Sequence, residues 1–109
     1  MSRRAIEFVG DSENSLFMSA ASAWEIATKF RIGKLPSAAE FVESIADALV
    51  AQGIDALDVT VAHAQRAGLL PGPLRDPFDR LLIAQAQAED LALVSNEQLF
   101  DRYGVRRIW

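Results

Sequence analysis

The sequence contains no cysteine and only one histidine, His63, among its 109 residues. The absence of cysteine excludes disulfides, cysteine-based zinc sites and thiol nucleophiles together. One histidine cannot build a cluster of histidine ligands, and His63 stands near a predicted helix start, where a surface or capping role is commoner than catalysis. Any metal ion that this chain binds must therefore be held by oxygen ligands.

Long apolar runs and a basic excess are also missing. No run approaches the ~20 residues of a membrane span, and the charged start has no signal-like apolar stretch behind it. We expect a soluble, cytoplasmic protein without a membrane partner. The formal net charge is −4, so any contact with RNA must be local rather than a property of the whole surface. The length allows a single domain over residues 1–109.

Four short apolar runs alternate with helical patterns and predict strands at residues 16–18, 54–59, 91–94 and 105–109. The third run is apolar at every position, as expected for a strand covered on both faces of a parallel sheet. This alternation predicts an α/β fold. Trp24, Phe30, Phe41 and Phe78 lie on predicted helices beside aliphatic residues, and we expect them in the core rather than as platforms for RNA bases.

The helix boundaries have local signals. Ser22 with Glu25 and Ser37 with Glu40 match the capping box, which predicts helices that begin near residues 22 and 37. The second of these should end at Gly53. The remaining predicted boundaries are Thr60 as the cap of a helix towards Gly68, Asp76 and Pro77 at the start of a helix through Ala88, and Asn96 before a short helix 97–103 that Gly104 ends.

Three acids stand at corresponding places in this pattern. Glu25 follows the first predicted strand, Glu97 follows the third, and Asp79 lies in the first turn of a helix. In parallel α/β sheets, sites form outside the carboxyl ends of the strands. Clustered carboxylates repel one another, and a hard divalent cation relieves that repulsion. Mg²⁺ or Mn²⁺ bound there could activate water for phosphodiester hydrolysis.

Each acid also has a simpler explanation. Glu25 can be only a capping-box residue that pairs with Lys29 at i+4, and Asp76 and Asp79 can be only acids at a helix N-terminus. Glu97 can be a solvated surface residue. Spacing alone therefore leaves a metal site as the minority interpretation.

Three residue strings resemble motifs of VapC-like PIN-domain ribonucleases, the toxins of type II toxin–antitoxin systems. Residues 19–29, SAASAWEIATK, with GKLP at 33–36, resemble the second motif. Residues 75–86, RDPFDRLLIAQA, resemble the third, and residues 93–100, LVSNEQLF, are similar to the fourth. The resemblance implies a three-layer α/β/α fold with a central, mainly parallel sheet, RNA cleavage with Mg²⁺ or Mn²⁺, a protein antitoxin as partner, and a homodimer.

The same resemblance assigns roles to individual residues. It implies that Glu25, Asp79 and Glu97 are the catalytic acids and metal ligands. Glu97 stands where the family usually has aspartate, and its longer side chain suggests binding through water. Two residues would support these acids from a second shell, Ser95 by a hydrogen bond and Asp76 as a helix cap. The RNA phosphates would be contacted by Lys29, Lys34 and Arg80.

One departure from the family lies at the start. Family members usually open with a strand that ends in a first catalytic aspartate, whereas Met1 falls inside the expected first helix and nothing upstream of Glu7 can act as that aspartate. We expect this central strand to be missing. A start codon placed too far downstream, a genuine remnant, and a dimer or rearranged sheet would each explain its absence.

Three functions remain open from the sequence. The first is a divalent-metal-dependent endoribonuclease regulated by an antitoxin. The second is a non-catalytic PIN-like module that dimerises or binds an antitoxin. The third is a receiver-like signalling domain, which predicts a lysine after the last strand of the acidic edge; residues 91–96 contain none.

Overall fold

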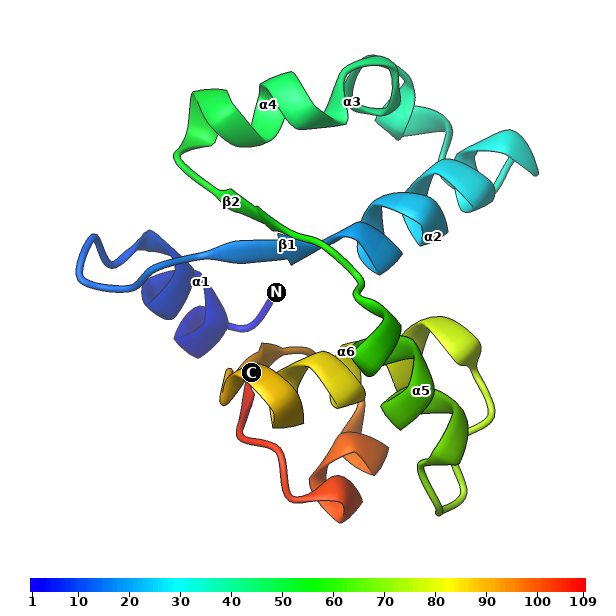
Figure 1. Cartoon of the computed structure of the whole chain (residues 1–109). Coiled ribbons are helices and arrows are strands. Elements are labelled where there is room, and N and C mark those ends of the chain that lie inside the picture. The colour runs from blue at the N-terminus through cyan, green and yellow to red at the C-terminus, as the bar shows by residue number, and fades with distance from the viewer. The chain divides into compact units, whose positions relative to one another are not determined.

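The computed structural model describes residues 1–109 and shows the predicted α/β fold, with short parallel strands between helices. The chain divides into two compact units (Figure 1). One consists of Met1–Asn14 with Val59–Trp109, and the other of Ser15–Asp58. No helix is long and apolar enough to cross a membrane.

The Ser15–Asp58 unit is built around one parallel strand pair. Strand β1 lies beside β2, with Phe17 opposite Asp55 and Ser19 opposite Leu57. In chain order its elements are β1 (Phe17–Ser19), α2 (Ala20–Arg31), the 3-10 turn η1 (Pro36–Ala38), α3 (Ala39–Glu43), α4 (Ile45–Gln52) and β2 (Asp55–Leu57). Both strands fall within the apolar runs that predicted them, to within a residue.

Two predicted helix caps in this unit are wrong, although helical segments begin close to the predicted positions. The cap of helix α2 is Ser19, the last residue of β1, three residues before the predicted cap Ser22; the Ser19 hydroxyl accepts a hydrogen bond from the Ala21 amide at 3.0 Å. Ser22 lies inside the helix. The predicted cap Ser37 lies inside η1, which Pro36 opens, and α3 has no side-chain cap.

The helix expected to run to Gly53 is interrupted. Ser44 leaves the helical backbone (φ −151°, ψ 55°), so the segment becomes two short helices, α3 and α4. The predicted end at Gly53 is confirmed, because this residue takes the left-handed conformation (φ 69°) that glycine tolerates best. Trp24 was expected in the core, but it is 63% exposed on α2.

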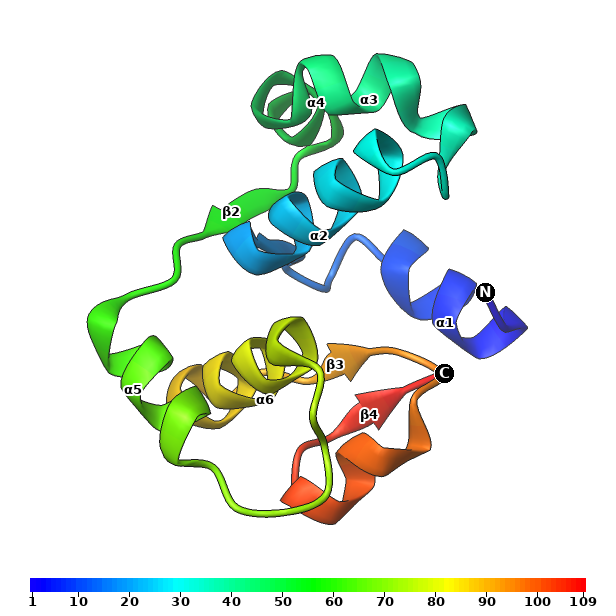
Figure 2. The same ribbon diagram turned by 90° about the vertical axis from the view of Figure 1, so that its right-hand side faces the viewer.

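The second unit contains the other parallel strand pair and the longest helix. Figure 2 shows β3 and β4 side by side next to α6, with Leu93 opposite Arg107 and Val94 opposite Ile108. Its elements are α1 (Arg3–Gly10), α5 (Val61–Leu69), α6 (Pro77–Glu89), β3 (Leu93–Val94), the 3-10 helix η2 (Gln98–Tyr103) and β4 (Arg107–Ile108).

Most helix boundaries of this unit agree with the sequence. Thr60 caps α5 and Asp76 caps α6 with Pro77 in its first turn, while Gly104 ends η2 in the left-handed conformation (φ 73°). One cap is shifted, since Glu97 rather than Asn96 caps η2. Glu97 has the longer reach, and its carboxylate turns back to accept the Leu99 amide at 3.0 Å.

The core of this unit lies between α6, η2 and the connection before α6. Leu74, Ile83 and Phe100 are buried there, and Leu70, Leu93, Tyr103 and Val105 pack around them. Ile83 and Phe100 are the largest fully buried side chains of the chain. This core fixes the positions at which α6 and η2 begin.

The four strands form two separate pairs rather than the one expected sheet. Residues 3–10 form helix α1, the first helix that the resemblance places at the start of the chain, with Ala5 fully buried. Each pair therefore has its hydrogen bonds only within itself.

Candidate metal centre

Two aspartates mark the start of α6. The Asp76 carboxylate oxygen Oδ1 accepts hydrogen bonds from the amides of Phe78 at 2.8 Å and Asp79 at 3.2 Å. Asp79 is half-buried in the first helical turn, and carboxylate oxygens of Asp76 and Asp79 lie within 4.8 Å of each other. The positive end of the helix dipole favours negative charge here. The predicted capping role of Asp76 is confirmed.

The connection that leads into α6 is fastened by Arg80. Its Nε donates to the Ala67 carbonyl at 3.0 Å and its Nη1 to the Leu74 carbonyl at 2.8 Å, while Nη2 donates to the Leu70 carbonyl. Three donors of the guanidinium are thus committed to backbone. This geometry gives Arg80 a structural role, and its predicted contact with RNA phosphate stays a prediction.

Tyr103 holds the same connection from the other side. Its hydroxyl accepts the Leu74 amide at 3.0 Å. Gly72 passes close to the ring with φ +112°, and a Cβ atom at Gly72 would lie 2.5 Å from the Tyr103 hydroxyl oxygen. Only glycine fits this position, so the connection before Asp76 has one well-defined path.

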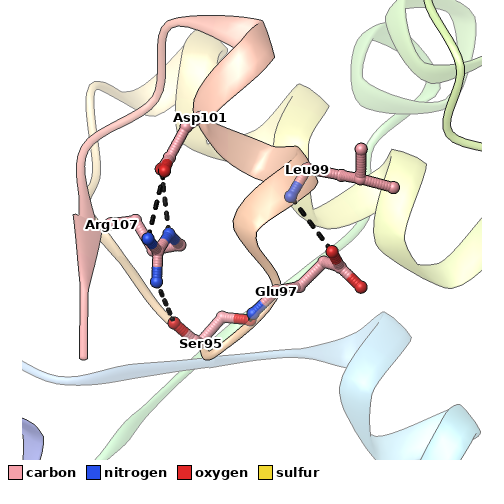
Figure 3. A network of polar contacts seen from close by, with 5 residues as sticks. All are labelled: Ser95, Glu97, Leu99, Asp101 and Arg107. Carbon is pink, nitrogen blue, oxygen red and sulfur yellow. Dashed lines mark hydrogen bonds and ion pairs between the residues drawn. The ribbon is translucent and has the colours of Figure 1, made fainter.

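Glu97 stands on a tight turn between β3 and η2 (Figure 3). The Ser95 hydroxyl accepts the Glu97 amide at 3.0 Å, and Glu97 Oε1 accepts the Leu99 amide at 3.0 Å. Glu97 is half-buried and lies in the same unit as Asp79, but it is not part of the close carboxylate pair at the start of α6. Ser95 therefore supports the turn that carries Glu97.

Arg107 on β4 closes this turn. Its Nε and Nη2 bind the two oxygens of Asp101 at 2.8 and 3.0 Å, and its Nη1 donates to the Ser95 carbonyl at 3.2 Å. The hydrogen bonds from Arg107 lower the pKa of Asp101 below its ordinary value. The same hydrogen bonds raise the pKa of Arg107, and the negative charges of Asp101 and Glu97 act in that direction.

The remaining predicted site residues lie in the Ser15–Asp58 unit. Glu25 is half-buried on α2 and forms an ion pair with Lys29 one turn later, at 3.7 Å. This is the i,i+4 pair that the sequence suggested. Such a pair with an exposed lysine contributes little, about 0.3–0.5 kcal/mol, so it does not prevent Glu25 from binding a cation. Lys34 is exposed beyond the end of α2.

The donor set suits a hard divalent cation. The predicted ligands Glu25, Asp79 and Glu97 offer carboxylate oxygens, which Mg²⁺ and Mn²⁺ prefer. The only imidazole is committed elsewhere: His63 is buried, its Nδ1 accepts the Thr60 amide at 3.1 Å, and its Nε2 contacts Glu89 at 2.8 Å. Of the two roles that the sequence suggested for His63, surface or capping, the structure shows the capping role, with the side chain buried.

Sequence reasoning missed the structural roles of two arginines that hold the supports of these acids. Arg80 reaches carbonyls 6, 10 and 13 residues away in the chain. Arg107 binds Asp101 across β4 and η2. The only sequence signal was a basic residue beside an apolar strand or helix start, which is equally typical of a solvated surface.

Comparisons with known proteins cover both units. The model of the PIN domain family matches residues 2–106. The chain is similar to "Ribonuclease VapC16" of Mycobacterium tuberculosis (strain ATCC 25618 / H37Rv), with 44% identity over 55 residues; these make up 50% of this chain and 39% of that protein. The match therefore spans less than half the length of this relative. No solved structure matches the chain significantly. Since the family match extends over nearly all its residues, the chain belongs to the PIN domain family.

Proposed function

We propose that this chain is a divalent-metal-dependent endoribonuclease, the toxin component of a toxin–antitoxin pair. The observation that carries the proposal is the pair of carboxylates at the start of α6, which lies inside the string that resembles the third motif of PIN-domain ribonucleases. The relative that matches half of the chain is named a ribonuclease. We also propose that the two units are parts of one PIN domain that acts in the cytoplasm, dimerises and binds a protein antitoxin.

In this proposal Glu25 and Asp79 bind Mg²⁺ or Mn²⁺ directly, and Glu97 binds it through water. The ion would supply a Lewis acid and a water molecule of lowered pKa. The chain itself orients the acids. Asp76 fixes the first turn of α6 that carries Asp79, and Ser95 holds the amide of Glu97.

The substrate is RNA, and Lys29 and Lys34 are the proposed phosphate contacts. Lys29 is about half exposed beside Glu25 and Lys34 is exposed near the end of the same helix. Local contacts of this kind suit a chain with net charge −4. Arg80, the third predicted contact, uses three guanidinium donors to hold the connection before α6, so any phosphate contact would involve its remaining N–H donors.

Calorimetric titration with Mn²⁺ tests the ligand assignment. Asp79→Asn and Glu25→Gln should each weaken Mn²⁺ binding at least ~10-fold, because each replaces a carboxylate ligand by a neutral amide of nearly the same size. Asp90→Asn is the matched control. Asp90 is an exposed acid in the left-handed conformation at the other end of α6, which asparagine also tolerates. Unchanged Mn²⁺ affinity in Asp79→Asn would reject the assignment.

A second candidate function is a non-catalytic PIN-like module that dimerises or binds an antitoxin. It is favoured because no acid of residues 1–14 lies at the end of a strand, where the family has its first catalytic aspartate. Glu7, Asp11 and Glu13 are all exposed, and none follows a strand. This candidate predicts a dimer by light scattering and no Mn²⁺ binding by calorimetry. Measurable Mn²⁺ binding that Asp79→Asn weakens would reject it.

A further inference from the structure

We infer that Arg107 is a positioning residue that fixes the carboxylate of Glu97 for a divalent cation. It does so by tying the Ser95 carbonyl to the Asp101 carboxylate across the turn that carries Glu97. The inference rests on the proposed role of Glu97 in metal binding. It adds a residue from β4, which lies outside all three strings that resemble family motifs.

The first step is the closed geometry of the turn. Arg107 binds Ser95, which precedes Glu97, and Asp101, which follows it, so one guanidinium connects both ends of the segment 95–101 (Figure 3). The contact with Asp101 is bidentate, and the Arg107 side chain is only 19% exposed. A planar guanidinium held at two sites is a rigid brace, because its donors have fixed directions.

The second step concerns what this brace does to Glu97. Inside the braced segment, Ser95 fixes the Glu97 amide and Leu99 holds one carboxylate oxygen, Oε1. The other carboxylate oxygen has no protein partner among these contacts and is available to a cation. Outer partners that orient a ligand in this way typically change metal affinity by about 10–100-fold.

The third step concerns charge. Arg107 places a positive charge near Glu97, and the charge of Glu97 acts on it. Asp101 binds two donors of that guanidinium and the Ser95 carbonyl a third, and Arg107 forms no ion pair with Glu97. By Coulomb's law alone, removing Arg107 would strengthen the binding of a cation at Glu97. A positioning role predicts the opposite result, so the sign of the effect separates the two.

The test is Mn²⁺ titration of the 109-residue chain by calorimetry, with urea unfolding of each variant as a check of folding. Arg107→Ala and Arg107→Lys should both weaken Mn²⁺ binding by about 10–100-fold. Lysine keeps the charge but cannot span Ser95 and Asp101 with two-site geometry. Arg106→Ala is the matched control: Arg106 is the neighbouring residue, 65% exposed and paired with Asp90. It should leave the affinity within 2-fold.

A double variant locates the effect. In a Glu97→Gln background, Arg107→Ala should cause no further loss of Mn²⁺ affinity, because the brace acts through Glu97. An equal further loss would overturn the inference. Unchanged or tighter Mn²⁺ binding by a folded Arg107→Ala variant would also overturn it. If the alanine variant does not fold, wild-type Mn²⁺ affinity in a folded Arg107→Lys variant would overturn it.

The same titration distinguishes failure of the inference from failure of the proposed function. If Asp79→Asn and Glu97→Gln weaken Mn²⁺ binding but Arg107→Lys and Arg107→Ala do not, only the positioning role is wrong. If neither acid variant changes the affinity, the proposed metal site itself is wrong, and the inference falls with it.

Discussion

The substitution Arg80→Ala should strongly destabilise the folded chain, although Arg80 lies near the start of α6 and is only partly buried. Its guanidinium donates to the carbonyl of Ala67 in the last turn of α5 and to those of Leu70 and Leu74 in the connection to α6. Alanine would leave these three acceptors without their donor. The connection that leads to Asp79 at the start of α6 would lose these three hydrogen bonds.

The magnitude follows from the three hydrogen bonds. A hydrogen bond to a charged group contributes about 1.5–3 kcal/mol, and bonds that hold the same segment are not additive. We therefore expect a loss of about 2–4 kcal/mol in the free energy of unfolding, a large part of the ~5–15 kcal/mol of a typical domain. Arg80→Lys should lose less, because one ammonium can replace part of the planar fork.

Urea unfolding followed by circular dichroism measures this loss, and the slope of the transition should stay unchanged. Arg75→Ala is the matched control, since Arg75 is an exposed arginine beside Asp76. It should change the stability by less than ~0.5 kcal/mol. If Arg80→Ala is equally neutral and instead weakens RNA binding, the structural role is refuted and the phosphate contact expected from the sequence is correct.

Three further predictions concern the supports of the candidate site. Asp76→Ala should lower the unfolding free energy by about 0.5–2 kcal/mol in urea, because α6 loses its cap; no loss would contradict the capping role. Gly72→Ala should cost about 1–3 kcal/mol in the same assay, since φ is +112° and the added Cβ meets the ring of Tyr103. Wild-type stability would show that the connection can move aside. Arg107 lowers the pKa of Asp101. The wild-type chain should therefore have a higher unfolding free energy than Asp101→Asn. This difference should be complete above the ordinary carboxyl pKa and should disappear as the pH falls through the lowered pKa of Asp101. A difference that persists below both pKa values would refute the assignment.

Local signals explain which elements the sequence could predict. Asp76 with Pro77 gave the start of α6 correctly, and Gly53 and Gly104 gave helix ends, because each acts through its own backbone and immediate neighbours. The start of α2 was misplaced because two serines three residues apart can both cap a helix. The cap is the earlier serine, Ser19, because β1 ends at this residue and α2 follows directly.

Long-range contacts explain what the sequence could not predict. The acids of the candidate site could be selected from motifs, but not the arginines that hold their supports. In the sequence, Arg80 and Arg107 cannot be distinguished from phosphate contacts or surface charges. Their structural roles depend on carbonyls and a carboxylate that come close to them only when the chain folds. The exposure of Trp24 is a similar case, because an aromatic residue on a helix carries no local sign of which face is covered.

The most direct test of the account is cleavage of RNA by the purified chain with Mn²⁺. We expect cleavage products that appear with Mn²⁺, disappear with a chelator, fall to background in Asp79→Asn and persist in the control Asp90→Asn. Cleavage that Asp79→Asn leaves unchanged, or that continues without a divalent cation, would contradict the central claim that carboxylates at the start of α6 bind the catalytic metal.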